Sequence, residues 1–121
     1  MIEQLASTAV QIVAVRVSGT LHDADYRLLE QLMDKALHHH QRLARLYIQF
    51  EDFHGWDLHA AWDDLKFGTR HYADLERIVL VGELRSMPWM VRLLRLFSRA
   101  EVRGFPLAEV PEAWAWLHQD I

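Results

Sequence analysis

The residues best suited to acid–base chemistry lie close together, at His54, Asp57, His59 and Asp63. General acid–base catalysis uses a positioned pair of groups that titrate near the working pH, and histidine beside a carboxylate is such a pair. His59 and Asp63 are four residues apart, which places them on one face of a helix. The spacing is compatible with catalysis, but such side chains on a helix face usually form only a solvated surface.

No catalytic motif accompanies these residues. The chain lacks a Gly-x-Ser-x-Gly elbow, a Gly-x-Gly-x-x-Gly loop, a phosphate loop with Gly-Lys-Ser or Gly-Lys-Thr, and any cysteine. These patterns position a nucleophile or a phosphate group. We therefore predict that the protein is not an enzyme and that it uses no cofactor.

The eight histidines raise the question of a metal site. The three consecutive histidines at 38–40 point about 100° apart on a helix, so they cannot all bind one ion. The pair of His59 and Asp63 lacks a third and fourth ligand at a recognised spacing. The pair of His22 and Asp23 lacks them too. The sequence therefore predicts no metal site.

Length, composition and charge indicate one domain that spans residues 1–121. The chain is 51% hydrophobic and contains no cysteine, so its core needs no disulfide. No secretory signal and no membrane-spanning apolar run are visible, and we expect a cytoplasmic protein. The net charge of -4 argues against nucleic-acid binding. The segment 85–103 differs, since it carries five arginines and one acid.

Alternating and helical apolar patterns predict a series of strands and helices that must position these residues. Strands are expected at 2–7, 11–18, 45–53, 77–82 and 101–105, and helices at 23–39, 57–72, 86–98 and from Pro111 onward. Strands that alternate with helices form a mostly parallel sheet, here with an antiparallel N-terminal edge strand. The predicted fold is therefore α/β, with about five strands and about four helices.

Several details follow from the same patterns. Gly19 should end the second strand, and the segment 20–23 has the spacing of a capping box for the first helix. The apolar run 77–82 predicts a central strand that is covered on both faces. Alternate side chains of a strand should lie on opposite faces of the sheet. In the strand 11–18, one face carries Val13, Val15 and Val17, and the other carries Ile12, Ala14 and Arg16. In the strand 45–53, one face carries Leu46, Ile48 and Phe50, and the other carries Tyr47, Gln49 and Glu51.

The carboxyl ends of the parallel strands should deliver turns at 19–23, 52–57, 82–88 and 104–106 to one edge, where sites in open α/β sheets form. His54 is expected in the second turn, either as a group that titrates near neutral pH or as a solvated histidine. Asp57 follows at a helix start, either as an N-cap or as a fixed negative charge. Aromatic residues on the converging elements favour an apolar pocket there.

The predicted helix 86–98 has apolar residues around more of its circumference than one packing stripe needs. It could line a pocket, or meet a membrane surface through a row formed by Arg92, Arg95 and Arg99. It could also pack against the same helix of a second copy. The alternative without any site is a helix buried in the fold, with the arginine stems along the apolar surface.

Four segments together resemble the SpoIIAA-like family, which is related in fold to STAS and CRAL-TRIO domains. They are Val17-Ser-Gly-Thr-Leu-His-Asp-Ala-Asp-Tyr26, Phe53-His-Gly-Trp56 followed by Trp62-Asp-Asp-Leu-Lys-Phe-Gly68, Glu76-Arg-Ile-Val-Leu-Val-Gly82, and Ala113-Trp-Ala-Trp-Leu117. The resemblance implies a STAS-like, mostly cytosolic α/β domain whose relatives switch partner proteins or hold apolar molecules. It implies no established catalytic residues. STAS-type antagonists carry a phosphorylatable serine where this chain has His54-Gly55-Trp56-Asp57, so no phosphoserine switch is expected.

We therefore predict a non-catalytic module that reversibly binds a small apolar or lipid-like ligand between the helices and the sheet. The predicted ligand-binding residues are Trp56, Trp62, Leu65, Phe67, Trp89, Leu93, Leu94 and Phe97, with His54 and Asp57 at the polar edge of the pocket. The alternative is a regulatory protein-interaction module that forms a homodimer through the helix 86–98.

Overall fold

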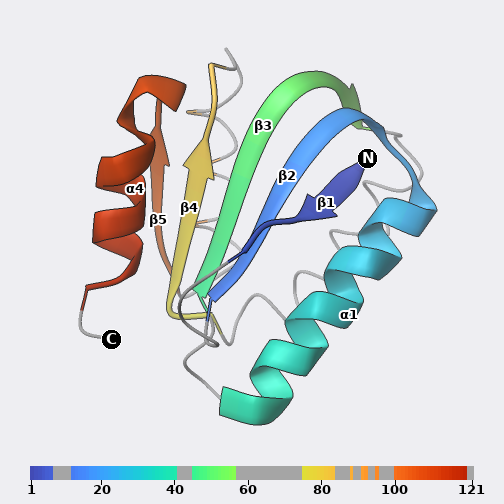
Figure 1. Ribbon diagram of the computed structural model, residues 1–121, viewed down its shortest axis with the longest axis horizontal. Helices are drawn as coiled ribbons and strands as arrows, with labels where there is room; N and C mark the ends of the chain where they lie inside the picture. The colour runs from blue at the N-terminus through green and yellow to red at the C-terminus, as the bar shows by residue number, and fades with distance from the viewer. Residues whose placement is uncertain are drawn as a thin grey trace.

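Five strands form one sheet in the order β1-β2-β3-β4-β5, shown in Figure 1. They span Ile2–Gln4 (β1), Ile12–Leu21 (β2), Arg45–Trp56 (β3), Arg77–Val81 (β4) and Glu101–Phe105 (β5). β1 pairs with β2 antiparallel, and the other three pairs of strands are parallel. The predicted mixed α/β sheet with an antiparallel N-terminal edge strand is confirmed.

The structure is a computed structural model. It describes residues 1–6, 12–40, 45–56, 75–83, 88, 91–92, 95 and 100–119, of which 23, 26, 36–40 and 53–56 are described by their backbone alone. The predicted helix 57–72 lies outside these residues.

Helices lie on both faces of the sheet, as Figure 1 shows. α1 spans Asp23–His40 on one face, and α4 spans Val110–Leu117 on the other, after a short 3-10 helix η2 at Leu107–Glu109. Pro88, Val91, Arg92 and Arg95 have helical backbone, in agreement with the predicted helix 86–98. Within the described residues, no helix combines the length and the apolar character that crossing a membrane requires.

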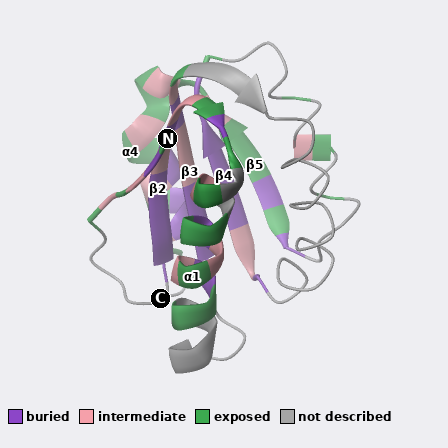
Figure 2. Ribbon diagram, turned by 90° about the vertical axis from the view of Figure 1, so that its right-hand side faces the viewer, coloured by how far each residue is buried: buried purple, intermediate pink, exposed green. Residues whose placement is uncertain are grey.

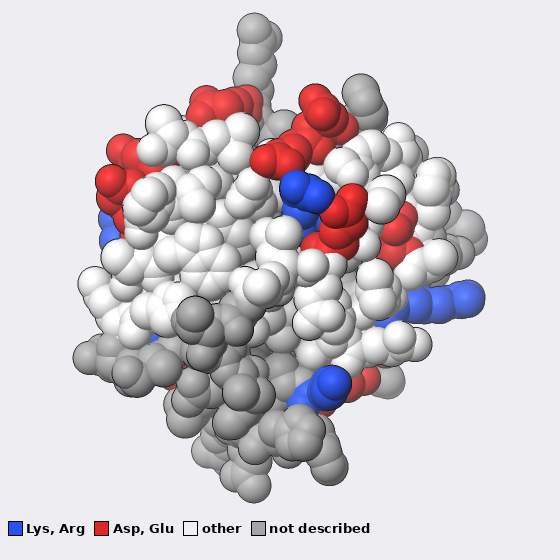
Figure 3. Space-filling model, viewed as in Figure 1, with Lys and Arg blue, Asp and Glu red and all other residues white. Residues whose placement is uncertain are grey.

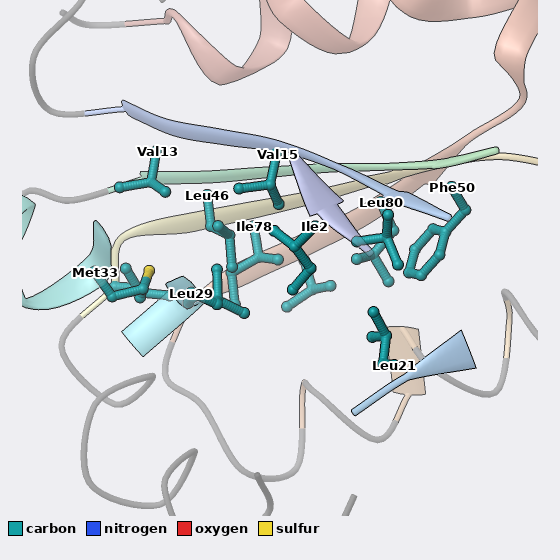
Figure 4. Close-up of a cluster of buried hydrophobic side chains, with 14 residues drawn as sticks. Ile2, Val13, Val15, Leu21, Leu29, Met33, Leu46, Phe50, Ile78 and Leu80 are labelled. Carbon is teal, nitrogen blue, oxygen red and sulfur yellow. The ribbon is translucent and has the colours of Figure 1, made fainter. Parts of the chain in front are cut away.

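The alternation of side chains along the strands divides the core into two clusters. Figure 4 shows the cluster on the α1 face, to which β2 contributes Val13, Val15 and Val17. The cluster on the α4 face takes Ile12 and Ala14 from the same strand. β4 is buried on both faces from Ile78 to Val81, as predicted, although β3 rather than β4 is the middle strand. Figure 2 shows the buried strands behind the largely exposed outer side of α1.

The carboxyl ends of β2 and β3 differ from the prediction. Gly19 does not end its strand, because β2 continues to Leu21 with Gly19 at a φ of 64°. β3 continues to Trp56. The register between β2 and β3 shifts on each side of Gly19, because β3 has extra residues there. One residue of this part of β3, Asp52, has a φ of 49°. Residues 52–56 therefore belong to β3, and the turn predicted at 52–57 was wrong for these residues. Bulges of this kind re-aim side chains at sheet edges without ending the pairing.

The left-handed backbone at Gly19 leads to a stability prediction. A Cβ atom added at Gly19 would meet nothing within 4 Å, so the only cost of Gly19→Ala is backbone strain. We expect this variant to lower the free energy of unfolding by about 1 kcal/mol in urea titrations. Gly19→Asn should cost less, because asparagine tolerates this conformation better. Equal losses of unfolding free energy for the two variants would contradict the attribution of the cost to the left-handed backbone of Gly19.

The start of α1 is capped differently from the prediction, although the helix begins at Asp23 as expected. Thr20 belongs to β2, and the carboxylate of Asp25 accepts a hydrogen bond from the backbone N–H of His22, at 3.0 Å. Asp25 also accepts from the backbone N–H of Ile2 at 3.2 Å, which joins β1 to the helix start. A carboxylate in the first turn is also favoured by the helix dipole.

Candidate functional site

The α1 face of the sheet carries a continuous apolar surface. Figure 4 shows Leu29 and Met33 of α1 facing the side chains of Leu46 and Ile78. The buried members of this cluster are Ile2, Val13, Val15, Val17, Leu21, Leu29, Met33, Leu46, Phe50, Leu75, Ile78, Leu80, Ala100 and Val102. All of these side chains are apolar, so this face has the chemistry of an apolar binding surface.

Ile48 departs from this pattern, since it is only partly buried. It lies on the middle strand, where its register partners Val15 and Leu80 are 0% and 1% exposed. Leu46 and Phe50, the next residues on the same face of β3, are buried as well. A side chain at the centre of a covered sheet would ordinarily be buried too. Solvent therefore reaches the apolar floor at Ile48, and these five residues are called the Ile48 site.

Among the described residues, two segments pack on this face. α1 packs mainly against β2 and β1, whereas Val91, which has helical backbone, packs on the apolar cluster. Arg95, one turn after Val91, donates hydrogen bonds from Nε (3.2 Å) and Nη2 (2.8 Å) to the carbonyl oxygen of Val102 in β5. Because α1 lies over one edge of the sheet and Arg95 is bound at the other, the Ile48 site on β3 lies between them.

This contact bears on the predicted row of arginines. Arg95 is exposed but already binds a backbone carbonyl group, and Arg92 is exposed. Arg99 lies outside the described residues. The side chain of Arg95 therefore helps to hold its helix against β5 and does not simply project into solvent.

On the opposite face, two arginines hold the carboxyl end of α4. Arg45 is 2% exposed and donates from Nη1 to the carbonyl oxygens of Leu117 (2.6 Å) and Gln119, and from Nη2 to Glu76 (2.6 Å). Arg77, its register partner on β4, donates to the carbonyl oxygen of Trp116 at 2.8 Å. The last carbonyl groups of a helix have no partner within the helix, and cations are favoured there. This arginine pair therefore anchors α4 on the sheet.

A chain of hydrogen bonds continues along the same face of β3. The Tyr47 hydroxyl donates to Gln49 (2.6 Å), and the amide of Gln49 donates to Glu51 (2.8 Å). Arg16 bridges the carboxylates of Glu51 and Glu3, which links β3 to β1. On the face seen in Figure 3, acidic side chains gather along the upper edge, and no broad basic patch is seen among the described residues. Each polar group of this network therefore has a structural partner.

The pKa of Tyr47 is raised above its usual value, first by burial and also by the charge of Glu51, against a hydrogen bond from Trp114 that lowers it. The Tyr47 ring stacks on Trp114 at 4.3 Å between centroids. Tyr47 is 0% exposed and cannot meet a substrate. In the described part of the chain, no three His, Asp or Glu residues come together to hold a metal ion.

The raised pKa predicts how stability depends on pH. The folded state favours the neutral phenol, so the stabilisation is complete below the unfolded pKa of about 10 and is lost as the pH rises through the higher folded value. We expect the free energy of unfolding to fall above about pH 10. Tyr47→Phe should make that fall shallower by up to about 1.4 kcal/mol per pH unit in urea titrations. Unchanged slopes in the variant and the parent protein would contradict this assignment.

Most of the predicted pocket residues lie outside the described residues. The backbone of His54 and Trp56 belongs to β3, where Trp56 pairs with Leu21. The predicted residues outside the description are Asp57, Trp62, Leu65, Phe67, Trp89, Leu93, Leu94 and Phe97, together with His59 and Asp63 from the acid–base set. The aromatic pocket therefore stays a prediction.

Sequence reasoning missed both Ile48 and Arg45. Nothing in the alternating pattern distinguishes Ile48 from Leu46 and Phe50, because exposure depends on where the covering helices end. Arg45 could have been found, since it and Arg77 each begin a strand, in register and on the same face. Two such cations at the start of neighbouring parallel strands indicate a helix end above them.

The chain is similar to known proteins in sequence and in structure. The SpoIIAA-like family model matches residues 12–118. No curated protein matches the chain. An uncharacterised protein from Shewanella loihica PV-4 with a SpoIIAA-like fold has a similar crystal structure, with a TM-score of 0.78 and 28% sequence identity over 97% of this chain and 92% of that one. Because the family model matches most of the chain, the chain belongs to the SpoIIAA-like family.

Proposed function

We propose that this STAS-like domain is a non-catalytic binding module, which reversibly takes up a small apolar or lipid-like ligand between its helices and the α1 face of the sheet. The observation that carries the proposal is the partial exposure of Ile48 among side chains that are all buried and apolar. Ligand sites are lined mostly by apolar side chains, and the surroundings of Ile48 have this chemistry.

The driving force is the removal of hydrocarbon from water. Each buried methylene group contributes about 0.8 kcal/mol, which corresponds to roughly a fourfold change in affinity. We therefore expect the Kd of straight-chain fatty acids to fall by about fourfold for each methylene group from eight to twelve carbons, measured by isothermal titration calorimetry below the micelle concentration. Affinities that do not depend on chain length would contradict an apolar site.

Variants of Ile48 connect the binding to this site. Ile48→Trp places a much larger side chain at this position and should weaken dodecanoic acid binding by at least tenfold, whereas Ile48→Leu keeps the volume and should bind normally. Circular dichroism and thermal unfolding check that both variants are folded. Dodecanoic acid bound equally by Ile48→Trp and the parent protein would place the ligand elsewhere.

Light scattering on the same samples tests the competing role as a homodimer. A monomer that binds dodecanoic acid supports the proposal. A dimer that Leu94→Glu dissociates, without any binding of fatty acid, supports a protein-interaction module instead. In that case the helix 86–98 is an interface between two copies.

A further inference from the structure

We infer that the outer edge of β5 is an interface for a second copy of this chain, and that the side chain of Arg95 keeps this edge closed. When Arg95 lets go, the two β5 strands pair antiparallel about a two-fold axis at Val102. Three features of the molecule support this interface: the direction of the backbone groups of β5, the hydrogen bonds from Arg95, and the charges along the strand. Ligand binding at the Ile48 site plays no part in it.

The hydrogen bonds between β4 and β5 show which backbone groups of β5 face outward. β5 is the last strand of the sheet, and Figure 2 shows it largely exposed. The N–H of Glu101 and the carbonyl oxygen of Phe105 bond to the residues just before and just after β4, each at 3.0 Å. In a parallel strand, residues that bond to one neighbour alternate with residues that face the other side. The backbone groups of Val102 and Gly104 therefore face away from the sheet.

Arg95 binds one of these outward groups. Its Nε (3.2 Å) and Nη2 (2.8 Å) atoms both donate to the carbonyl oxygen of Val102. An edge strand is a template for pairing with another chain, and charged side chains are one means of blocking it. Gly104, two residues further along the same edge, is exposed to solvent. One exposed arginine therefore closes an edge that is open at Gly104.

The charges along β5 favour a second copy as the partner and set its register. Outward residues lie opposite each other in an antiparallel pair, because they form the hydrogen-bonded pairs. With Val102 opposite itself, Glu101 of each copy lies opposite Arg103 of the other, and this pairing of opposite charges is favourable. With Val102 opposite Gly104, Arg103 lies opposite itself, which is unfavourable. With Gly104 opposite itself, the strands overlap only near their ends. The preferred register therefore needs the carbonyl group that Arg95 holds.

Both charged side chains are accessible to a partner. The side chain of Glu101 is 69% exposed, although its carboxylate lies 3.7 Å from Arg77. Arg103 is exposed, and its guanidinium group lies 5.2 Å from the ring centroid of Phe105 and 5.4 Å from that of Trp116. A guanidinium group held against aromatic rings can still direct its N–H groups to a carboxylate. Arg103 is therefore positioned in advance for the ion pair with Glu101 of the second copy.

Analytical ultracentrifugation of the full chain tests the role of Arg95. Loss of a hydrogen bond from a charged donor changes an equilibrium by roughly 10- to 100-fold. We therefore expect Arg95→Met, which has no donor, to dimerise at least tenfold more tightly than the parent protein. The matched variant Arg92→Met removes another exposed arginine and should behave as the parent protein does. A smaller difference between Arg95→Met and the parent protein, or no dimer of either, would overturn the inference.

Circular dichroism checks that the variants are folded. If Arg95→Met is unfolded, Arg95→Gln and its control Arg92→Gln take the place of the methionine pair, with the same expected direction. Glutamine has a shorter side chain than arginine and carries no charge, so it cannot replace the two bonds to Val102.

Disulfide cross-linking tests the register, because the chain has no cysteine of its own. Glu101→Cys and Arg103→Cys are each combined with Arg95→Met, and the two proteins are mixed and oxidised. Residues opposite each other in a non-hydrogen-bonded pair have Cα atoms about 4.5 Å apart, which a disulfide can bridge. We expect the mixture to cross-link at least fivefold more than either protein alone. A dimer of Arg95→Met without this difference would use another surface, such as the helix 86–98, and would overturn the inference.

Discussion

We expect Arg45→Met to lower the free energy of unfolding by about 3 kcal/mol, measured by urea denaturation. The Arg45 side chain is 3% exposed and supplies hydrogen bonds to two carbonyl oxygens at the end of α4 and to the carboxylate of Glu76. Methionine fills much of the same volume but donates nothing. The carbonyl groups of Leu117 and Gln119 would then lose the donor that Arg45 provides.

Two features limit the size of this loss. Glu76 is 35% exposed, so water can take the place of its arginine partner. The Nε atom of Arg45 has no hydrogen-bond partner, and methionine removes that unsatisfied group as well. The remaining cost comes mainly from the helix carbonyl groups, each of which contributes about 1–3 kcal/mol when buried without a donor.

Matched variants separate this effect from a general effect of charge. Arg92→Met removes an exposed arginine and should change the free energy of unfolding by less than about 0.5 kcal/mol. Arg45→Lys keeps the charge but has a single donor group in place of the fork, and should give an intermediate loss. If Arg45→Met were as stable as Arg92→Met, the anchoring role of Arg45 would be refuted.

The sheet could be predicted from the sequence because its strands follow simple burial patterns. Val13, Val15 and Val17 alternate with Ile12 and Ala14, and the structure places the two sets in different clusters, as expected. The continuous apolar run of β4 correctly indicated a strand covered on both faces. These patterns depend only on which side chains leave water, so they are visible without tertiary information.

The ends of β2 and β3 could not be predicted in the same way. Gly19 was expected to end β2, and residues 52–57 were expected to form a turn, but Gly19 and Gly55 both pair within the sheet. Pairing continues because β3 takes up extra residues opposite β2, with Asp52 in a left-handed conformation. A bulge is a property of two strands together, whereas the local sequence shows each strand alone.

The candidate site was only partly accessible to sequence reasoning. The pattern placed Ile48 on the same face as Leu46 and Phe50, and the structure agrees. Its exposure depends in part on the spacing between α1 and the segment that Arg95 holds at β5. That spacing is set by contacts between distant parts of the chain, including the bond from Arg95 to Val102, which no local pattern reveals.

The second large effect concerns Trp116, which packs α4 onto the sheet. Trp116 is 9% exposed and belongs to the cluster on the α4 face, with Arg77 and Arg103 5.1 Å and 5.4 Å from its ring centroid. We expect Trp116→Ala to lower the free energy of unfolding by about 4 kcal/mol in urea titrations. The loss includes the cavity and the cation–π contacts.

Combining Trp116→Ala with Arg45→Met tests whether the two residues act through the same helix. α4 has eight residues and is too short to be stable alone, so it stays helical only while it is docked. Once it detaches, neither side chain can contribute further, and the double variant should lose at least about 1 kcal/mol less than the sum of the single losses. Leu29→Ala, on the α1 face, should instead add to Trp116→Ala within about 0.5 kcal/mol. Full additivity of Arg45→Met and Trp116→Ala would show that each residue stabilises the sheet independently of α4 docking.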